Sequence, residues 1–65
     1  MTMNEVNAVL KLYNLRLRKR KNGMYWVREL GKKDWKALGL MSFTDSTIAN
    51  EAALNHVLKY LAAYI

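Results

Sequence analysis

The chain contains no cysteine and no proline, and it has one histidine among its 65 residues. Without cysteine it forms no disulfide and no thiolate metal site, and a single histidine does not make a zinc centre. No apolar run reaches the ~20 residues that a membrane-spanning helix needs. We therefore expect neither a metal nor a cofactor, and no membrane partner.

Acidic residues are also scarce, with five Asp and Glu against eleven Lys and Arg and a net charge of +6. The imbalance is local, because residues 11–36 hold ten of the basic residues but only Glu29 and Asp34 on the acidic side. The rest of the chain has more acidic than basic residues. Charge gathered in one part of a small protein indicates an anionic partner.

Hydrophobic residues make up 52% of the chain, which is enough for one small core. A domain of this size buries only about 60% of the surface of its unfolded chain. We predict one domain over residues 1–65, and a homodimer is an open alternative because it would bury more area. Residues 1–5 lack the basic start and apolar core of a signal peptide, which favours a cytoplasmic location.

Three segments in the middle of the chain have the features of β-strands. Residues 13–18 alternate apolar and polar side chains, and residues 24–30 are rich in aromatic and β-branched residues. Asn22-Gly23 between them predicts a two-residue type I′ hairpin turn, because both residues tolerate a positive φ. Residues 31–34 predict a second turn and residues 35–41 a third strand, with Gly39 at a bulge or a close backbone approach.

The last third of the chain changes from strand spacing to helix spacing. Apolar residues recur every three or four positions among alanines, which are strong helix formers. The stripe consists of Leu54, Val57, Leu58, Leu61 and Ile65. We predict a helix from about residue 46 to residue 64, with Thr44, Asp45 or Ser46 as its N-cap.

The N-terminal residues fit two interpretations. Val6, Leu10, Tyr13 and Leu17 share one face of a helix, so a single helix over residues 3–18 is one alternative. We prefer a short helical or irregular segment to about Leu10, followed by a strand. The predicted fold class is therefore α+β: a three-stranded antiparallel sheet packed against a C-terminal α-helix, with a short N-terminal helix as an optional element.

Alternation along the strands sorts side chains onto two faces of this sheet. The helix would cover Leu15, Leu17, Tyr25 and Val27, and the opposite face would carry arginines and tryptophans. That opposite face is expected to hold Arg16, Arg18, Arg20, Trp26, Arg28 and Trp35. Trp35 suits the core and the surface equally, since tryptophan is highly buried on average. Lysines at turns and edges could meet phosphates, namely Lys19, Lys21, Lys32, Lys33 and Lys36.

Four segments of this layout carry a resemblance to known DNA-binding domains. They are residues 16–20, Gly23-Met24-Tyr25-Trp26-Val27-Arg28, Trp35-Lys36-Ala37-Leu38-Gly39, and Phe43-Thr44-Asp45 before a helix with Glu51-Ala52-Ala53. The chain resembles the sheet-plus-helix domain of plant ethylene-response factors and is similar to the arm-binding N-terminal domains of phage and transposon tyrosine integrases. In that fold the sheet face away from the helix lies in the major groove. The resemblance implies Arg16, Arg18, Arg28 and Trp35 as DNA contacts, with Trp26 near them.

Charge and aromatic residues together predict a small basic protein that binds double-stranded DNA, of the kind that assists transcription or recombination in phages or mobile elements. RNA or a single strand is an alternative partner, because tryptophans stack on unpaired bases. The candidate contact residues are Arg16, Arg18, Lys19, Arg20, Lys21, Trp26, Arg28, Lys33, Trp35 and Lys36.

A different class of function uses the same surface. A small protein-binding module or inhibitor would capture an acidic host protein there, since Trp and Arg are enriched at interface hot spots. Ser42, Thr44, Ser46 and Thr47 have the pattern of helix caps rather than nucleophiles. No paired carboxylates, metal ligands or phosphate loop occur in the sequence, so we do not expect an enzyme.

Overall fold

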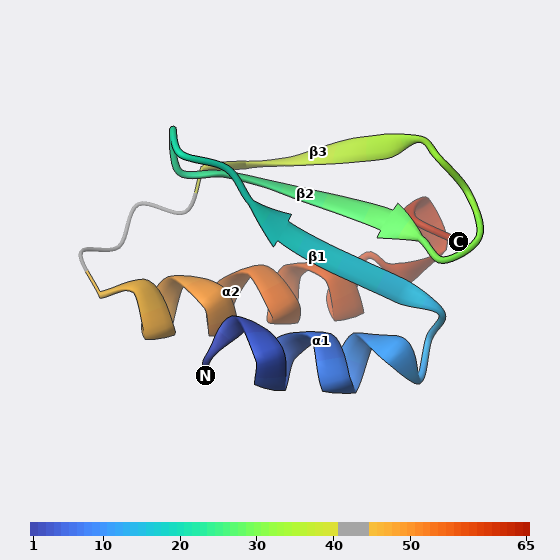
Figure 1. Ribbon diagram of the computed structural model, residues 1–65. Helices are drawn as coiled ribbons and strands as arrows, with labels where there is room; N and C mark the ends of the chain where they lie inside the picture. Colours follow the sequence, from blue (N-terminus) through green and yellow to red (C-terminus); the bar gives the residue numbers. More distant parts are fainter. Residues whose placement is uncertain (41–44) are drawn as a thin grey trace.

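The computed structural model describes residues 1–40 and 45–65. The chain runs through α1 (Met3–Lys11), β1 (Leu15–Lys19), β2 (Met24–Glu29), β3 (Trp35–Leu40) and α2 (Ser46–Lys59), then a short 3₁₀ turn at Leu61–Ala63. The strands form one antiparallel sheet in the order β1-β2-β3. Both helices lie side by side under one face of this sheet (Figure 1). The predicted α+β fold is confirmed, including the short N-terminal helix.

Residues close to each end of helix α1 determine where it begins and where the chain turns after it. Thr2 Oγ1 accepts a hydrogen bond from the Glu5 backbone N–H at 3.2 Å, and Glu5 Oε1 accepts one from the Thr2 N–H at 2.8 Å, which makes a capping box. After the helix, Asn14 adopts a left-handed conformation with φ of 61°, which asparagine tolerates. The chain turns there, so the alternative of one helix over residues 3–18 is wrong, and β1 starts at Leu15 rather than at Tyr13.

The hairpin between β1 and β2 differs from the predicted two-residue turn. Its loop has three residues, because the Gly23 N–H donates to the Arg20 carbonyl at 2.9 Å and the Arg20 N–H donates to the Met24 carbonyl at 2.9 Å. Gly23 has a φ of 82° and Asn22 does not have a positive φ. This is a type I turn closed by a left-handed glycine. Asn22 Oδ1 instead accepts from the Met24 N–H at 3.0 Å, a side-chain turn typical of asparagine.

The predicted bulge at Gly39 is confirmed. Tyr25 pairs with Gly39 and Trp26 with Ala37, so Leu38 is an extra residue in β3. Gly39 has a φ of 109°, and a Cβ built on it meets no atom within 4 Å. The backbone conformation therefore explains the glycine, and close approach of another segment does not. Met41, predicted as the end of this strand, lies outside the described residues.

Helix α2 is shorter than predicted. It starts at the Asp45 N-cap, whose carboxylate accepts from the Thr47 N–H at 2.8 Å, while Thr44, the first cap candidate, lies outside the described residues. It ends at Lys59, because Tyr60 leaves the helical conformation with φ of −114° and ψ of 38°. The following 3₁₀ turn lets Leu61 pack partly buried against the core. Ile65, predicted on the apolar stripe, is 59% exposed.

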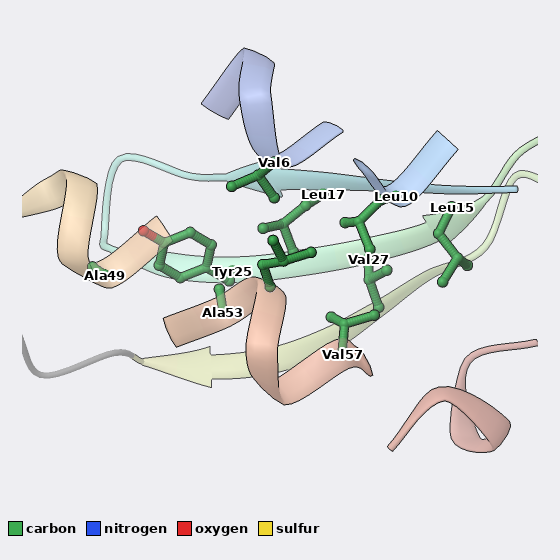
Figure 2. Packing of buried hydrophobic residues seen from close by; sticks show 10 residues of the cluster. Val6, Leu10, Leu15, Leu17, Tyr25, Val27, Ala49, Ala53 and Val57 are labelled. Carbon is green, nitrogen blue, oxygen red and sulfur yellow. The ribbon is translucent and has the colours of Figure 1, made fainter. Parts of the chain in front are cut away.

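The core fills the space between the sheet and the two helices (Figure 2). Strands β1 and β2 contribute two large buried side chains each, α1 contributes Val6 and Leu10, and α2 contributes two alanines together with Leu54 and Val57. The buried cluster is Val6, Leu10, Leu15, Leu17, Tyr25, Val27, Ala49, Ala53, Leu54 and Val57. Each large side chain stabilises the fold by about 1.5–3 kcal/mol when fully buried. Among the described residues, no helix is long and apolar enough to cross a membrane.

One polar interaction crosses this core. The Tyr25 hydroxyl donates to Asn50 Oδ1 at 2.6 Å, and Asn50 Nδ2 donates to the Met1 carbonyl at 3.2 Å. Asn50 is itself buried at 8% exposure, so its amide depends on these partners. The bonds connect β2, α2 and the segment before α1, and they fix how the three pack.

Asn7 on α1 closes the free edge of β1. Its side-chain oxygen accepts from the Leu17 N–H at 2.7 Å, and its side-chain NH₂ donates to the Leu17 carbonyl at 3.0 Å. Unpaired backbone groups on an edge strand invite pairing with another chain. The two bonds therefore anchor α1 to the sheet and block strand addition at this edge. No pattern in the sequence indicated this role for Asn7.

Replacing Tyr25 by Phe is expected to lower the free energy of unfolding by about 1–3 kcal/mol, because Asn50 Oδ1 loses its buried donor. Burial raises the pKa of Tyr25 above its ordinary value of 10.0. The folded state therefore favours the protonated phenol, so this contribution is complete below about pH 10 and is lost as the pH rises further. Urea unfolding from pH 7 to pH 11 measures both effects. The exposed Tyr13→Phe variant is the control, and equal stability of the two variants would contradict the role of the buried bond.

Replacing Asn7 by Ala is expected to cost about 1–3 kcal/mol, since the Leu17 N–H and carbonyl are left without partners. Asn4→Ala removes the same amide from the exposed side of α1 and should change stability little. Thermal unfolding of both variants checks the difference. If Asn7→Ala melts at the same temperature as Asn4→Ala, the edge bonds do not hold α1 in place.

Candidate nucleic-acid interface

The face of the sheet away from the helices carries a grid of arginines and tryptophans, here called the outer face. Arg16 of β1 pairs with Arg28 of β2, which pairs with Trp35 of β3. In the next row, Arg18 pairs with Trp26. Arg20 follows at the end of β1. The outer face therefore consists of Arg16, Arg18, Arg20, Met24, Trp26, Arg28, Trp35 and Ala37 among the described side chains.

Both tryptophans lie on the outer face, and neither belongs to the buried cluster. Their rings are covered by arginines: the Arg20 guanidinium lies 4.8 Å from the centre of the Trp26 ring, and that of Arg28 lies 5.1 Å from the centre of the Trp35 ring. Stacking of this kind attracts the cation to the ring and restricts its movement. The rings are half-buried as a result, and two of the four arginines are held in place on the sheet.

Arg28 is held by a second contact. Its Nη1 donates to the Lys32 carbonyl at 2.8 Å, which leaves the rest of its fork on the outer face. Arg16 and Arg18 are exposed, so their guanidinium groups are free to reach a partner. The indole N–H of Trp26 is buried and has no hydrogen-bond partner among the described residues. The face thus combines arginines that are held by other groups with arginines that are exposed.

The predicted lysines do not share one surface. Lys19 lies opposite Tyr25, on the helix side of β1, with its ammonium 5.7 Å from the centre of the Tyr25 ring. Lys21 is exposed at the hairpin tip, and Lys33 is exposed between β2 and β3. Lys36 pairs with Val27, and its Nζ donates to the Ala63 carbonyl at 3.1 Å, on the helix side of the sheet. The structure therefore places Lys36 away from the outer face.

No carboxylate lies on the described outer face. The nearest acidic residues along the strands are Glu29, which forms an ion pair with Lys32 at 3.2 Å, and Asp34, which is exposed in the following turn. A surface that carries basic side chains and no acidic ones produces a positive potential that attracts anions. This electrostatic property follows from the alternation of the strands and not only from the net charge.

Two hollows lie beside the outer face along β1. One, of about 610 Å³, is lined by residues 18–22 of the hairpin. The other, of about 560 Å³, extends from the outer face over the β1 edge to Asn4 of α1 and Ser46 of α2. The sequence did not indicate the residues from the helices, because no local pattern shows that both helices begin beside this edge.

The described residues hold no group of three or more His, Asp or Glu side chains that could bind a metal ion. The ring of the histidine, His56, lies against that of Tyr60 at a tilt of 51°, with ring centres 4.9 Å apart. Comparison of the chain with protein-family models, curated proteins and solved structures finds no match. The function is therefore inferred from the surface itself.

The positive potential of the outer face is measurable by ionic quenching of Trp26 fluorescence in the Trp35→Phe variant. Iodide should quench at least about twice as well as caesium, each normalised to N-acetyltryptophanamide, because the arginines concentrate anions. Added chloride should remove the difference by screening. The Arg18→Gln change, at the β1 residue that pairs with Trp26 of β2, should reduce the difference between the two ions. Equal normalised constants for the two ions would show that the ring does not lie in a cationic environment.

Proposed function

We propose that this protein binds double-stranded DNA through the outer face of its sheet. The observation that carries the proposal is the grid of four arginines and two tryptophans on an uncovered face without carboxylates among the described residues. Arginine is the residue that most often makes specific contacts in the major groove, where its fork donates to guanine O6 and N7. The expected setting is cytoplasmic, as an accessory of transcription or recombination.

The dimensions of the β1–β2 hairpin support this proposal. Three of the four arginines of the outer face belong to these two strands, Arg20 follows directly after β1, and the major groove admits a two-stranded ribbon. Arg16 and Arg18 occupy alternate positions on β1 and Arg20 continues the alternation just after it, so they repeat about every 6.7 Å. Two base-pair steps of duplex DNA span about 6.8 Å. Successive arginines can therefore meet every second base pair or phosphate without a change in the strand.

The stacked arginines favour a duplex over a single strand. Binding of unpaired bases needs open aromatic faces on which the bases stack. Here Arg20 covers Trp26 and Arg28 covers Trp35, so a base would first have to displace a cation from each ring. A duplex keeps its bases stacked and presents phosphates and groove edges, which the arginines reach as they lie. Lys21 and Lys33 at the turns would add phosphate contacts that position the protein.

The test is the affinity for a labelled duplex across a salt series. A variant with Arg16, Arg18 and Arg28 changed to Gln should lose on the order of 100-fold in affinity, because each arginine contact is worth at least about 1 kcal/mol. Its slope of log K against log salt should fall by about 0.9 for each phosphate that the variant no longer neutralises. Circular dichroism would confirm that the variant folds, as expected for side chains outside the core.

The matched control changes Lys11, Lys36 and Lys59 to Gln, which removes three charges from outside the outer face. We expect less than about a threefold loss, since these changes alter only the overall potential. Equal losses in the two triple variants would contradict a role for the outer face. The protein-binding alternative would be supported instead if the protein bound an acidic protein tightly at physiological salt and still retained it after nuclease treatment.

A further inference from the structure

The hollow of about 560 Å³ along the β1 edge brings together parts of the chain that are distant in sequence. Its lining includes Asn4 from α1, Arg16, Arg18 and Lys19 from β1, and Ser46 from α2. Arg18 and Lys19 also line the hollow at the hairpin, so the two hollows are neighbours along this edge and are together called the β1-edge groove. It runs from the hairpin tip to the first turns of both helices.

The groove is closed to a peptide strand. A strand would need the outward backbone groups of β1, but the N–H and carbonyl of Leu17 are already bonded to Asn7. Asn50, which also lines the groove, is bonded to Tyr25 and Met1. The fold thus uses both of these amides. Asn4 and Ser46 remain as exposed polar groups at the rim.

Charge identifies the kind of partner. Arg16, Arg18 and Lys19 supply three cations to the wall, and Lys21 adds another at the hairpin end. Among the described residues, no acidic side chain lines either hollow. The nearest acids along the chain are the helix caps: Asp45 accepts from the Thr47 N–H and hydroxyl, and Glu5 accepts from the Thr2 N–H. A cationic channel with exposed amide and hydroxyl groups suits a chain of phosphates.

We propose that the β1-edge groove holds one sugar–phosphate strand of the bound duplex, so that α1 belongs to the DNA interface. This inference rests on the proposed function and makes the complex asymmetric: the duplex lies on the outer face, and one of its backbones passes over the β1 edge, where Arg16 and Arg18 belong to both surfaces. At the opposite edge, Lys36 of β3 is bonded to Ala63 on the helix side, and the hollow that it lines also holds Glu29 and Asp34.

Asn4 provides a sharp test because it is exposed, lies in the first turn of α1 and contacts no arginine through an observed hydrogen bond. Asn4→Asp should weaken duplex binding about fivefold at low salt, through repulsion of a nearby phosphate. Asn4→Lys should strengthen binding and raise the salt slope by about 0.9. An acid in the first turn favours the helix, so Asn4→Asp should fold normally.

Asn55 offers a matched control, since it is an exposed asparagine on α2 that does not line the groove. Asn55→Asp and Asn55→Lys make the same charge changes and should alter affinity less than about twofold. Equal effects at positions 4 and 55 would overturn the inference while leaving the outer-face proposal intact. Failure of the wild-type protein to bind duplex, or a preference for a single strand, would overturn both.

Discussion

The structure depends on one constraint: the chain can cover only one face of its sheet. Leu15, Leu17, Tyr25 and Val27 alternate along β1 and β2, and both helices are needed to bury them. Nothing of the described chain is left to cover the other face (Figure 1). Strand geometry then sends every intervening side chain to that open face. The placement of arginines and tryptophans there is therefore a direct consequence of burying the core.

The open face carries an electrostatic cost in the free protein. Arg16 and Arg28 are cross-strand neighbours, and like charges in such positions repel each other. Stacking of Arg20 on Trp26 and of Arg28 on Trp35 offsets part of this cost, at about 0.5–1 kcal/mol for each exposed pair. A polyanion would remove the repulsion and release counterions on binding. The same repulsion in the free domain would thus favour the proposed complex with DNA.

Sequence patterns predicted those parts of the fold that local physics decides. Alternation identified the inward and outward residues of β1 and β2, and Gly39 marked the bulge because a positive φ is easy only for glycine. The predictions for the length of the β1–β2 loop and for the end of α2 were wrong. Asn22-Gly23 fits two kinds of turn, and only the pairing of Arg20 with Met24 decides between them. The apolar stripe continues past Lys59, and only the packing of Leu61 shows that the helix stops there.

The sequence likewise predicted only part of the candidate site. The outer-face arginines follow from period-two spacing, whereas stacking on tryptophan depends on side-chain geometry across neighbouring strands. The charge of Lys36 led to the prediction of a phosphate contact, but its position in the strand register directs its side chain towards the Ala63 carbonyl. Asn7 and Asn4 carry no signal of their own in the sequence. The bonds of Asn7 and the place of Asn4 beside the β1 edge arise from the packing of α1 against β1, which is a tertiary property.

We propose that duplex DNA meets the outer face of the sheet, with the start of α1 beside it at the β1 edge, and does not meet the rest of the helical layer. The most direct measurement is a nuclear magnetic resonance titration of the isotope-labelled protein with a short duplex. We expect large shifts for the indole N–H signals of Trp26 and Trp35 and for the amides of β1 and β2, with little change in the second half of α2. Shifts confined to α2 and the C-terminal turn, with both indole signals unmoved, would contradict the proposal.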